Sequence, residues 1–308
     1  MSRKRKGNII RNINWEEGLV QFLSEKAAQG RSERTLKDYD YHVRQFYHRY
    51  AEGDLKTNLY KYLAEKCAPA TFNLRLVYLK AYFKWVAEQG FLEENPLESI
   101  TRRKAEPRIV QIDSSVLARL ISLPDINTYA GLRDKALICL TLDTGIRPKE
   151  ACNLSVSDFN SKMLEVIVPA DIAKTRKQRT LPISQLTCSL IARLISVRPT
   201  EWAKDVVLFA SADGTTLNKN TWGDRLEHYS TIIGVKIRPY DLRHAFALGF
   251  LRNGGNALFL QRIMGHTDLN MTKRYVAATD EDLRNALTSA SPLARLVKPK
   301  RIINIHEK

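Results

Sequence analysis

Hydrophobic residues in the first hundred positions recur every three or four residues, the spacing of an α-helix that buries one face. This pattern predicts four helices. The first contains Trp15 to Leu23, the second begins after a Ser32 cap, the third covers 55–64, and the fourth begins at Pro69. An alternating strand pattern does not compete with them. We therefore expect residues 12–98 to form a compact, four-helix domain.

From about Ser114 the pattern becomes mixed. Two short runs, 164–168 and 179–183, read as strands, and the polar, basic segment 173–178 joins them. Helices are expected around them, over 114–123, 131–143, 184–196, 218–233, 240–253, 256–264 and 268–275. The predicted fold class is thus mainly α with a small β-sheet, and residues 109–290 form a second, mixed α/β domain.

Three connecting or terminal segments complete the predicted organisation. Residues 99–108 are short, basic and proline-containing, which is typical of a linker. This linker is either a solvated loop or a strap across a phosphate backbone, and the charge of Arg102, Arg103 and Lys104 favours the strap. Residues 1–11 form a basic tail, and 291–308 form a tail that either is disordered or docks on another surface.

The charge balance changes the picture more than the overall composition does. The 308 residues contain 49 Lys and Arg against 33 Asp and Glu, a net charge of +16. Such an excess favours a polyanion, and hence nucleic acid, as the partner. The sequence lacks both a signal peptide and an apolar run long enough for a membrane span, so we expect a cytoplasmic protein. The four scattered cysteines suggest neither a zinc site nor a disulfide framework, and are expected to be buried thiols.

Three segments carry candidate chemistry, although each alone has an ordinary structural explanation. In 144–150, Gly145 ends one helix and Pro148 starts the next, which places Arg147 at a helix N-terminus with Glu150 able to hold it. In 239–246, Tyr240 and Arg243 share a helix face. In 264–275, His266 occupies a turn and Tyr275 ends a short helix.

Taken together, these segments resemble the tyrosine recombinases, the phage integrase family. The T-G-x-R-x-x-E box matches 144–150, and a K-x-x-K-x-R-x-x-P-[LI] run begins at Lys174. The H-x-L-R-H-[AST]-F-A box matches 240–247 except at its first position, and the L-[LM]-G-H-[SAT] box matches 263–267. Tyr275 lies nine residues after His266, where the family has its nucleophile. The resemblance covers roughly residues 12 to 290, in an Xer-like or simple-integrase layout.

The resemblance implies a helical core-binding domain and a catalytic domain that cleaves and rejoins DNA. Tyr275 would attack a phosphodiester and form a 3′-phosphotyrosine, so that rejoining needs no ATP. Arg147 and Arg243 would stabilise the phosphate, and His266 would hydrogen-bond it. Lys174 would protonate the leaving 5′-oxygen, and Glu150 would contact Arg147 and not the phosphate. Arg176 and Lys177 are candidate DNA contacts, and neither a metal nor a cofactor is implied.

The family also implies an assembly, and several questions stay open. The expected partner is double-stranded DNA. A homotetramer would bind two DNA sites, and the protein would be a monomer or dimer when free of DNA. The resemblance does not decide whether an accessory protein or partner recombinase takes part, or whether the origin is a mobile element or a chromosome. It also leaves open an integrase, resolvase or Xer role. The alternatives are a type IB topoisomerase and a DNA-binding protein that kept the fold without catalysis.

One position departs from the family. Tyr240 stands where the family most often has histidine. A phenol titrates at about pH 10, so Tyr240 is a poor base but a usable hydrogen-bond donor. We expect it to position the phosphate with activity retained; the alternative is that it marks a slowed enzyme.

Overall fold

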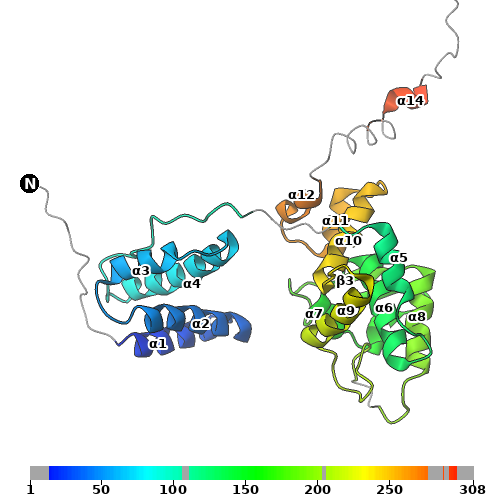
Figure 1. The fold of residues 1–308 in the computed structure, drawn as a ribbon, viewed down its shortest axis with the longest axis horizontal. Helices are drawn as coiled ribbons and strands as arrows, with labels where there is room; N and C mark the ends of the chain where they lie inside the picture. Colours follow the sequence, from blue (N-terminus) through cyan, green and yellow to red (C-terminus); the bar gives the residue numbers. More distant parts are fainter. Residues whose placement is uncertain (1–13, 106–110, 203–205, 277–286, 288–290, 297–308) are drawn as a thin grey trace, which may run out of the picture. The chain divides into compact units, whose positions relative to one another are not determined.

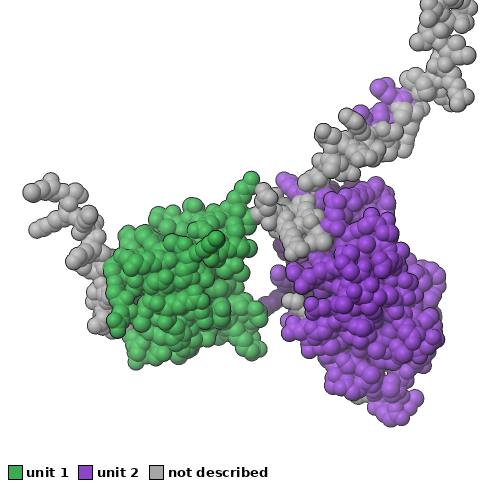
Figure 2. Space-filling model, viewed as in Figure 1, with its two compact units in different colours: residues 1–106 green, residues 107–308 purple. Residues whose placement is uncertain are grey.

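The structure is a computed structural model that describes residues 14–105, 111–202, 206–276, 287 and 291–296. The chain divides into two compact units, residues 1–106 and 107–308, which Figure 2 shows in different colours. The division falls within the basic segment 99–108. Each unit has a hydrophobic core of its own.

The first unit contains the helices that the hydrophobic spacing predicts. They are α1 (Trp15–Ala28), α2 (Glu33–Arg49), α3 (Leu55–Ala64) and α4 (Pro69–Glu88). Side chains of Asn14, Ser32 and Asp54 accept backbone N–H groups at the starts of α1, α2 and α3. Proline occupies the first turn of α4, where its missing N–H costs nothing. The four-helix prediction is confirmed (Figure 1).

Aromatic side chains dominate the core of this unit. Helix α2 packs on α1 and α4, and α3 packs on α4. The Phe22 ring meets the rings of Tyr39, Tyr82 and Trp85 edge to face. Such pairs add about 0.5–1.5 kcal/mol each beyond the area they bury. Within residues 14–105, the core therefore holds the helices together without a named strand or a disulfide.

The packing of the first unit continues past residue 98. Leu97 is fully buried, and Ile100 lies against the same core. The backbone of Arg103 exchanges two hydrogen bonds with the Asn73 side chain on α4, at 2.8 and 2.9 Å. Its guanidinium carbon lies 3.8 Å from the centroid of the Phe72 ring. The start of the predicted linker is thus tied to α4.

The second unit surrounds one buried helix. Helix α6 (Tyr129–Thr144) is covered on most sides and packs on α8 (Gln185–Ser196) and α10 (Pro239–Arg252). The elements before α10 also include α5 (Ser114–Ser122), α7 (Pro148–Cys152), the 3₁₀ helix η1 (Val156–Asp158) and α9 (Lys219–Ile233). All predicted helices in this region are present, with bounds shifted by one or two residues.

A small antiparallel sheet lies beside these helices, in the order β1-β2-β3. Strands β2 (Glu165–Val168) and β3 (Arg179–Pro182) pair with Val166 opposite Leu181, both fully buried. They form the two strands that were predicted. Strand β1 (Phe159–Asn160) was not predicted, because two residues are too few to show an alternating pattern.

Three helices after α9 build the end of the unit. Helix α10 packs against α11 (Ala257–Met264) and α12 (Leu269–Val276), and α11 packs on α12 (Figure 1). Gly265 ends α11 in the left-handed conformation expected of a C-cap. The short helix α14 (Pro292–Leu296) carries exposed Leu293 and Leu296. The predicted tail 1–11 and the rest of the tail 291–308 lie outside the described residues.

Two smaller expectations can be compared with the structure. Of the four free cysteines, Cys139, Cys152 and Cys188 are buried as expected, but Cys67 is only half-buried. No helix in the described part of the chain combines the length and apolarity that a membrane crossing requires.

Candidate active site

The turn between α6 and α7 is shaped by glycine. Gly145 has φ of 59°, in the left-handed region that side chains disfavour. A Cβ built on it would lie 2.4 Å from Cδ1 of Phe246 on α10. The chain then enters α7 with Arg147 as the N-cap and Pro148 in the first turn, as the sequence predicts. The close approach to α10 brings the Gly145 carbonyl to the Arg243 guanidinium, which donates a hydrogen bond to it.

Gly145→Ala is therefore expected to lower the free energy of unfolding by about 2–4 kcal/mol, because it combines left-handed strain with a clash against a buried ring. Gly234→Ala is the matched control. Gly234 also ends a helix, α9, at positive φ, but its Cβ would meet nothing within 4 Å. Denaturant unfolding of both variants checks the prediction. Equal losses of unfolding free energy in the two variants would mean that the Phe246 ring can move away from the new Cβ at no cost.

Glu150 is the acceptor at the centre of the site. Its carboxylate accepts hydrogen bonds from Arg147 Nη1 at 3.0 Å, Arg179 Nη2 at 2.5 Å and the Lys174 backbone N–H at 3.1 Å. Burial alone would raise the pKa of Glu150, but the hydrogen bond and charge of Arg179, followed by the charge of Arg147, outweigh it and lower the pKa. Glu150 is thus held ionised, and it does hold Arg147 as the sequence suggests.

The end of α11 gathers three guanidiniums. Its last carbonyls are those of Ile263, Met264 and Gly265. The first accepts from Arg179 Nε at 3.1 Å, the second from Arg243 Nη2 at 2.9 Å, and the third from Arg147 Nη2 at 2.8 Å. Carbonyls at a helix C-terminus lack intrahelical partners and form the negative end of the helix dipole. They therefore orient three cations that would otherwise repel one another.

Arg243 is the most enclosed of these cations, with 4% of the residue exposed. Burial lowers the pKa of its guanidinium to about 9, and the nearby charge of Arg147 adds to the effect. A lowered pKa means that the environment penalises the charged form, although the group is still protonated at neutral pH. An anion bound beside Arg147 and Arg243 would remove this penalty.

His266 follows the α11 cap and bridges two elements. Its Nε2 lies 3.0 Å from Arg243 Nη2, and its Nδ1 lies 2.9 Å from Oγ1 of Thr272 on α12. A guanidinium only donates, so Nε2 is the acceptor and Nδ1 of the neutral ring carries the proton toward Thr272. Arg243 thereby sets the tautomer of His266, and Thr272 accepts from its Nδ1–H and helps to orient the ring.

Tyr275 comes from α12 and packs against the small hydrophobic cluster of Phe246, Ala247, Leu260 and Met264. Its hydroxyl oxygen lies 2.7 Å from Nδ1 of His244 on α10. It is also close enough to Arg243 for a charge on the phenol to raise the pKa of that guanidinium. The structure thus brings Tyr275 to the same end of α10 and α11 as Arg147, Arg243 and His266.

Other predicted residues lie apart from this network. Tyr240 is 44% exposed, and its side chain makes no hydrogen bond to another described residue. The Lys174 side chain is exposed in the loop between β2 and β3, where only its backbone is held by Glu150. Arg176 and Lys177 are exposed in the same loop. In the first unit, Arg102 and Lys104 are exposed, and Arg103 covers Phe72.

Three residues of the network were given no role in the sequence analysis: Arg179, Thr272 and His244. Arg179 and His244 fall inside the matched motifs, so a signal was present without an assignment. Thr272 carries no signal beyond lying one helical turn before Tyr275. Their contacts arise only after folding.

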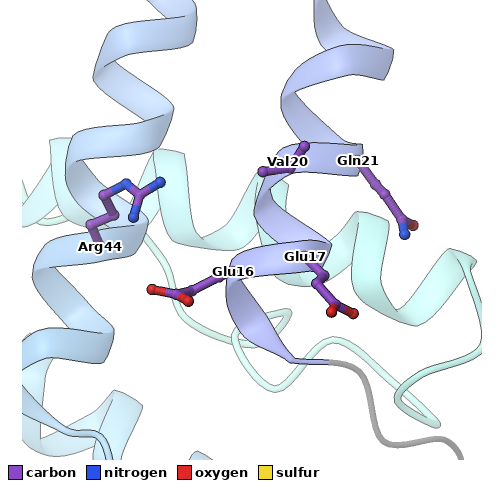
Figure 3. A pocket seen from close by; sticks show the side chains of 5 residues that line it. All are labelled: Glu16, Glu17, Val20, Gln21 and Arg44. Carbon is purple, nitrogen blue, oxygen red and sulfur yellow. The ribbon is translucent and has the colours of Figure 1, made fainter.

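Outside this network, the described residues form no candidate metal centre. Among residues 14–105 and the described parts of 111–296, no group of three His, Cys, Asp or Glu side chains could hold a metal ion. A pocket of about 530 Å³ in the first unit is lined by Glu16, Glu17, Val20, Gln21 and Arg44 (Figure 3). It contains neither a histidine nor a tyrosine, and Arg44 pairs with Asp40.

Comparison with known proteins places the chain in a family. The sequence model of the phage integrase family matches residues 111–282, more than half of the chain. Tyrosine recombinase XerC of Shewanella amazonensis is 25% identical over 293 residues, covering 92% of this chain and 97% of that protein. Tyrosine recombinase XerA of Pyrococcus horikoshii is 28% identical over 278 residues, covering 88% and 93%.

The fold is shared with solved structures. The Tn1549 transposon integrase in complex with a circular intermediate DNA superposes with a TM-score of 0.70 at 18% identity. The match covers 88% of this chain and 99% of that one. The motifs, the helical fold with its small sheet, and the family model agree, so the chain belongs to the phage integrase family of tyrosine recombinases.

Proposed function

We propose that this protein is a site-specific DNA recombinase that cleaves and rejoins DNA through a 3′-phosphotyrosine at Tyr275, without metal or ATP. The observation that carries the proposal is the convergence of Arg147, Arg243 and His266 at the end of α11, next to the helix that bears Tyr275. The relatives named tyrosine recombinases, and the DNA-bound integrase of the same fold, support it.

The arginines suit a phosphodiester. Within the described residues, Arg147 and Arg243 use only part of their N–H donors on protein acceptors, so each keeps donors for phosphate oxygens. Planar guanidiniums bind such oxygens in pairs and are held in place before the substrate arrives. The lowered pKa of Arg243, caused by its burial, adds a reason for the site to take up an anion.

Covalent chemistry then follows from the position of Tyr275. Its hydroxyl oxygen attacks the phosphorus, and the 5′-oxygen leaves with a proton supplied by Lys174, whose exposed loop can reach toward a substrate. The phosphotyrosine retains the energy of the broken bond, so a 5′-hydroxyl can reverse the step. Glu150 holds Arg147 in place, and Arg179 in turn holds Glu150.

We propose that the DNA lies against both units. The exposed cations Arg102, Lys104, Arg176 and Lys177 are candidates for phosphate contacts, which add affinity but carry no sequence information. Exchange of both strands of two duplexes needs four cleavages, and each chain has one Tyr275, so a homotetramer on two sites is the expected complex. We place the complex in the cytoplasm. In the alternative with a partner recombinase, that protein would take two of the four positions in place of this chain.

A trapping experiment tests the proposal. The protein is incubated with a library of nicked duplexes, covalent adducts are isolated under denaturing conditions, and the attached DNA is sequenced. A recombinase yields one enriched site linked to Tyr275 through a 3′-phosphate. Random attached sequences, together with relaxation of plasmids that lack the site, would instead indicate a topoisomerase. Absence of any adduct would contradict both activities.

Tyr240 gives a separate prediction. Because its side chain is exposed and stands outside the network of Arg243 and His266, Tyr240→His is expected to change the single-turnover cleavage rate by less than about tenfold. The rate is measured on a nicked suicide duplex built from the recovered site, with Tyr240→Phe as the matched control. A much larger gain for the histidine variant would show that the natural tyrosine slows the enzyme.

A further inference from the structure

The Tyr275 hydroxyl contacts a histidine to which the resemblance assigns no role in catalysis. Nδ1 of His244 lies 2.7 Å from Tyr275 Oη, and the ring centroids are 5.6 Å apart. The two residues come from α10 and α12, which pack on each other. The Tyr275 ring also packs against the cluster that contains Phe246 and Met264. The contact therefore joins two packed helices.

We propose that His244 is a catalytic residue that accepts the proton of the Tyr275 hydroxyl as that oxygen attacks the DNA phosphate. The inference rests on the proposed function. The distance is within the range required of a general base, about 2.6–3.2 Å. An ordinary phenol loses its proton at about pH 10, and an ordinary imidazole gains one at about pH 6.5. A neutral histidine is therefore a suitable proton acceptor at physiological pH.

The other titratable groups of the site are engaged elsewhere. Both ring nitrogens of His266 have partners, Arg243 and Thr272. The Glu150 carboxylate is shared by Arg147 and Arg179, and its lowered pKa, in which these cations outweigh burial, makes it a weak base. Tyr240, at the position where the family most often has histidine, is exposed and is itself a phenol. His244, by contrast, contacts the attacking oxygen directly.

In the tautomer with a proton on Nε2, Nδ1 has a free electron pair that takes the proton from Oη. Oη forms the bond to phosphorus with its own electron pair. The bond between phosphorus and the 5′-oxygen breaks, and that oxygen takes a proton from the Lys174 ammonium. Rejoining reverses both transfers, so His244 returns its proton to Oη when the phosphotyrosine is broken.

The position of His244 also explains how the base stays aligned. Arg243 and His244 are adjacent on α10, and side chains one residue apart on a helix point in different directions. Arg243 reaches the α6–α7 turn and the end of α11, while His244 meets α12. One helix therefore presents the phosphate-binding group and the base to their separate partners.

The test measures single-turnover formation of the covalent adduct on a nicked suicide duplex that carries the site recovered by trapping. His244→Gln, which keeps a hydrogen-bonding side chain but is no base, is expected to slow the step by about 100-fold or more. His228→Gln on α9 is the matched control, since His228 is exposed and lies outside the site. The control is expected to keep the wild-type rate and both variants are expected to keep DNA affinity.

Two chemical substitutions separate proton acceptance from positioning. A fluorinated tyrosine at position 275, whose phenol ionises at lower pH, should restore most of the rate lost in His244→Gln. A duplex with sulfur in place of the bridging 5′-oxygen, whose leaving group needs no proton, should rescue Lys174→Ala but not His244→Gln. Failure of the fluorinated tyrosine to rescue would overturn the assignment of His244 as proton acceptor.

The remaining outcomes are also decisive. An adduct that forms at the wild-type rate in His244→Gln overturns the inference and leaves the proposed function intact. Rescue of His244→Gln by the sulfur-containing duplex would place His244 on the side of the leaving group and overturns it too. If the wild-type protein forms no adduct, the proposed function and this inference fail together.

Discussion

Replacing Tyr275 by phenylalanine is expected to abolish the covalent protein–DNA adduct and to leave DNA binding intact. The change removes one oxygen, while the ring that packs against Phe246 and Met264 keeps its shape. The change removes the hydrogen bond to His244, and a hydrogen bond of this kind contributes about 1 kcal/mol to stability. Denaturing gels detect the adduct, and mobility shifts under native conditions detect binding.

Tyr229→Phe is the control for this prediction. Tyr229 lies on α9, where its hydroxyl donates to the Asp134 carboxylate at 2.9 Å. Burial, together with Asp134, raises the pKa of Tyr229 to about 12, which makes it a poor nucleophile. Tyr229→Phe should therefore still form the adduct. If Tyr275→Phe forms it as well, the nucleophile has been misassigned, and Tyr229 and Tyr240 become the candidates.

The helices could be predicted from the sequence because each one buries a regularly spaced face or has a clear end signal. Ser32 and Pro69 mark helix starts, and Gly145 and Gly265 mark helix ends, at the residues where the structure has them. Strand β1 escaped prediction because it has only two residues and depends on pairing with β2. Local signals suffice for helices and are too weak for such a strand.

The site could be predicted only in part. Arg147 and Glu150 are three residues apart, so their contact follows from local helix geometry and was predicted. The contacts of Arg179 with Ile263, and of His244 with Tyr275, join segments far apart in the chain. Spacing along the sequence carries no information about which residues meet across a folded core. Motif resemblance filled part of this gap, but it gave residue types and not the hydrogen bonds between them.

The arrangement at the end of α11 explains why so many cations can be buried together. Three carbonyl groups and the Glu150 carboxylate supply the negative partners that Arg147, Arg179 and Arg243 need. One guanidinium nitrogen, Nη1 of Arg179, is nevertheless buried without a hydrogen-bond partner among the described residues. The cluster is thus satisfied well enough to fold and retains positive charge for a substrate.

Arg243→Lys is expected to reduce the single-turnover rate of adduct formation by about 10³-fold, although the positive charge is kept. The guanidinium uses two separate nitrogens to reach the carbonyls of Gly145 and Met264, and one of them also contacts His266. A single ammonium cannot occupy both places, so the lysine would lose the fixed geometry that stabilises charge on the phosphate in the transition state. Overall DNA affinity should change little, because it is spread over many phosphate contacts.

Arg225→Lys provides the comparison for Arg243→Lys. Arg225 lies on α9 and pairs with Asp134 through Nε at 2.7 Å, outside the arginine cluster. The same chemical change there should alter the rate by no more than a few-fold, with folding of both variants checked by circular dichroism. A rate for Arg243→Lys within about tenfold of the wild type would mean that charge alone stabilises the transition state. The contacts to Gly145, Met264 and His266 would then serve to pack α10 against α6 and α11. Arg147 would be the remaining guanidinium that stabilises the transition state by directed hydrogen bonds.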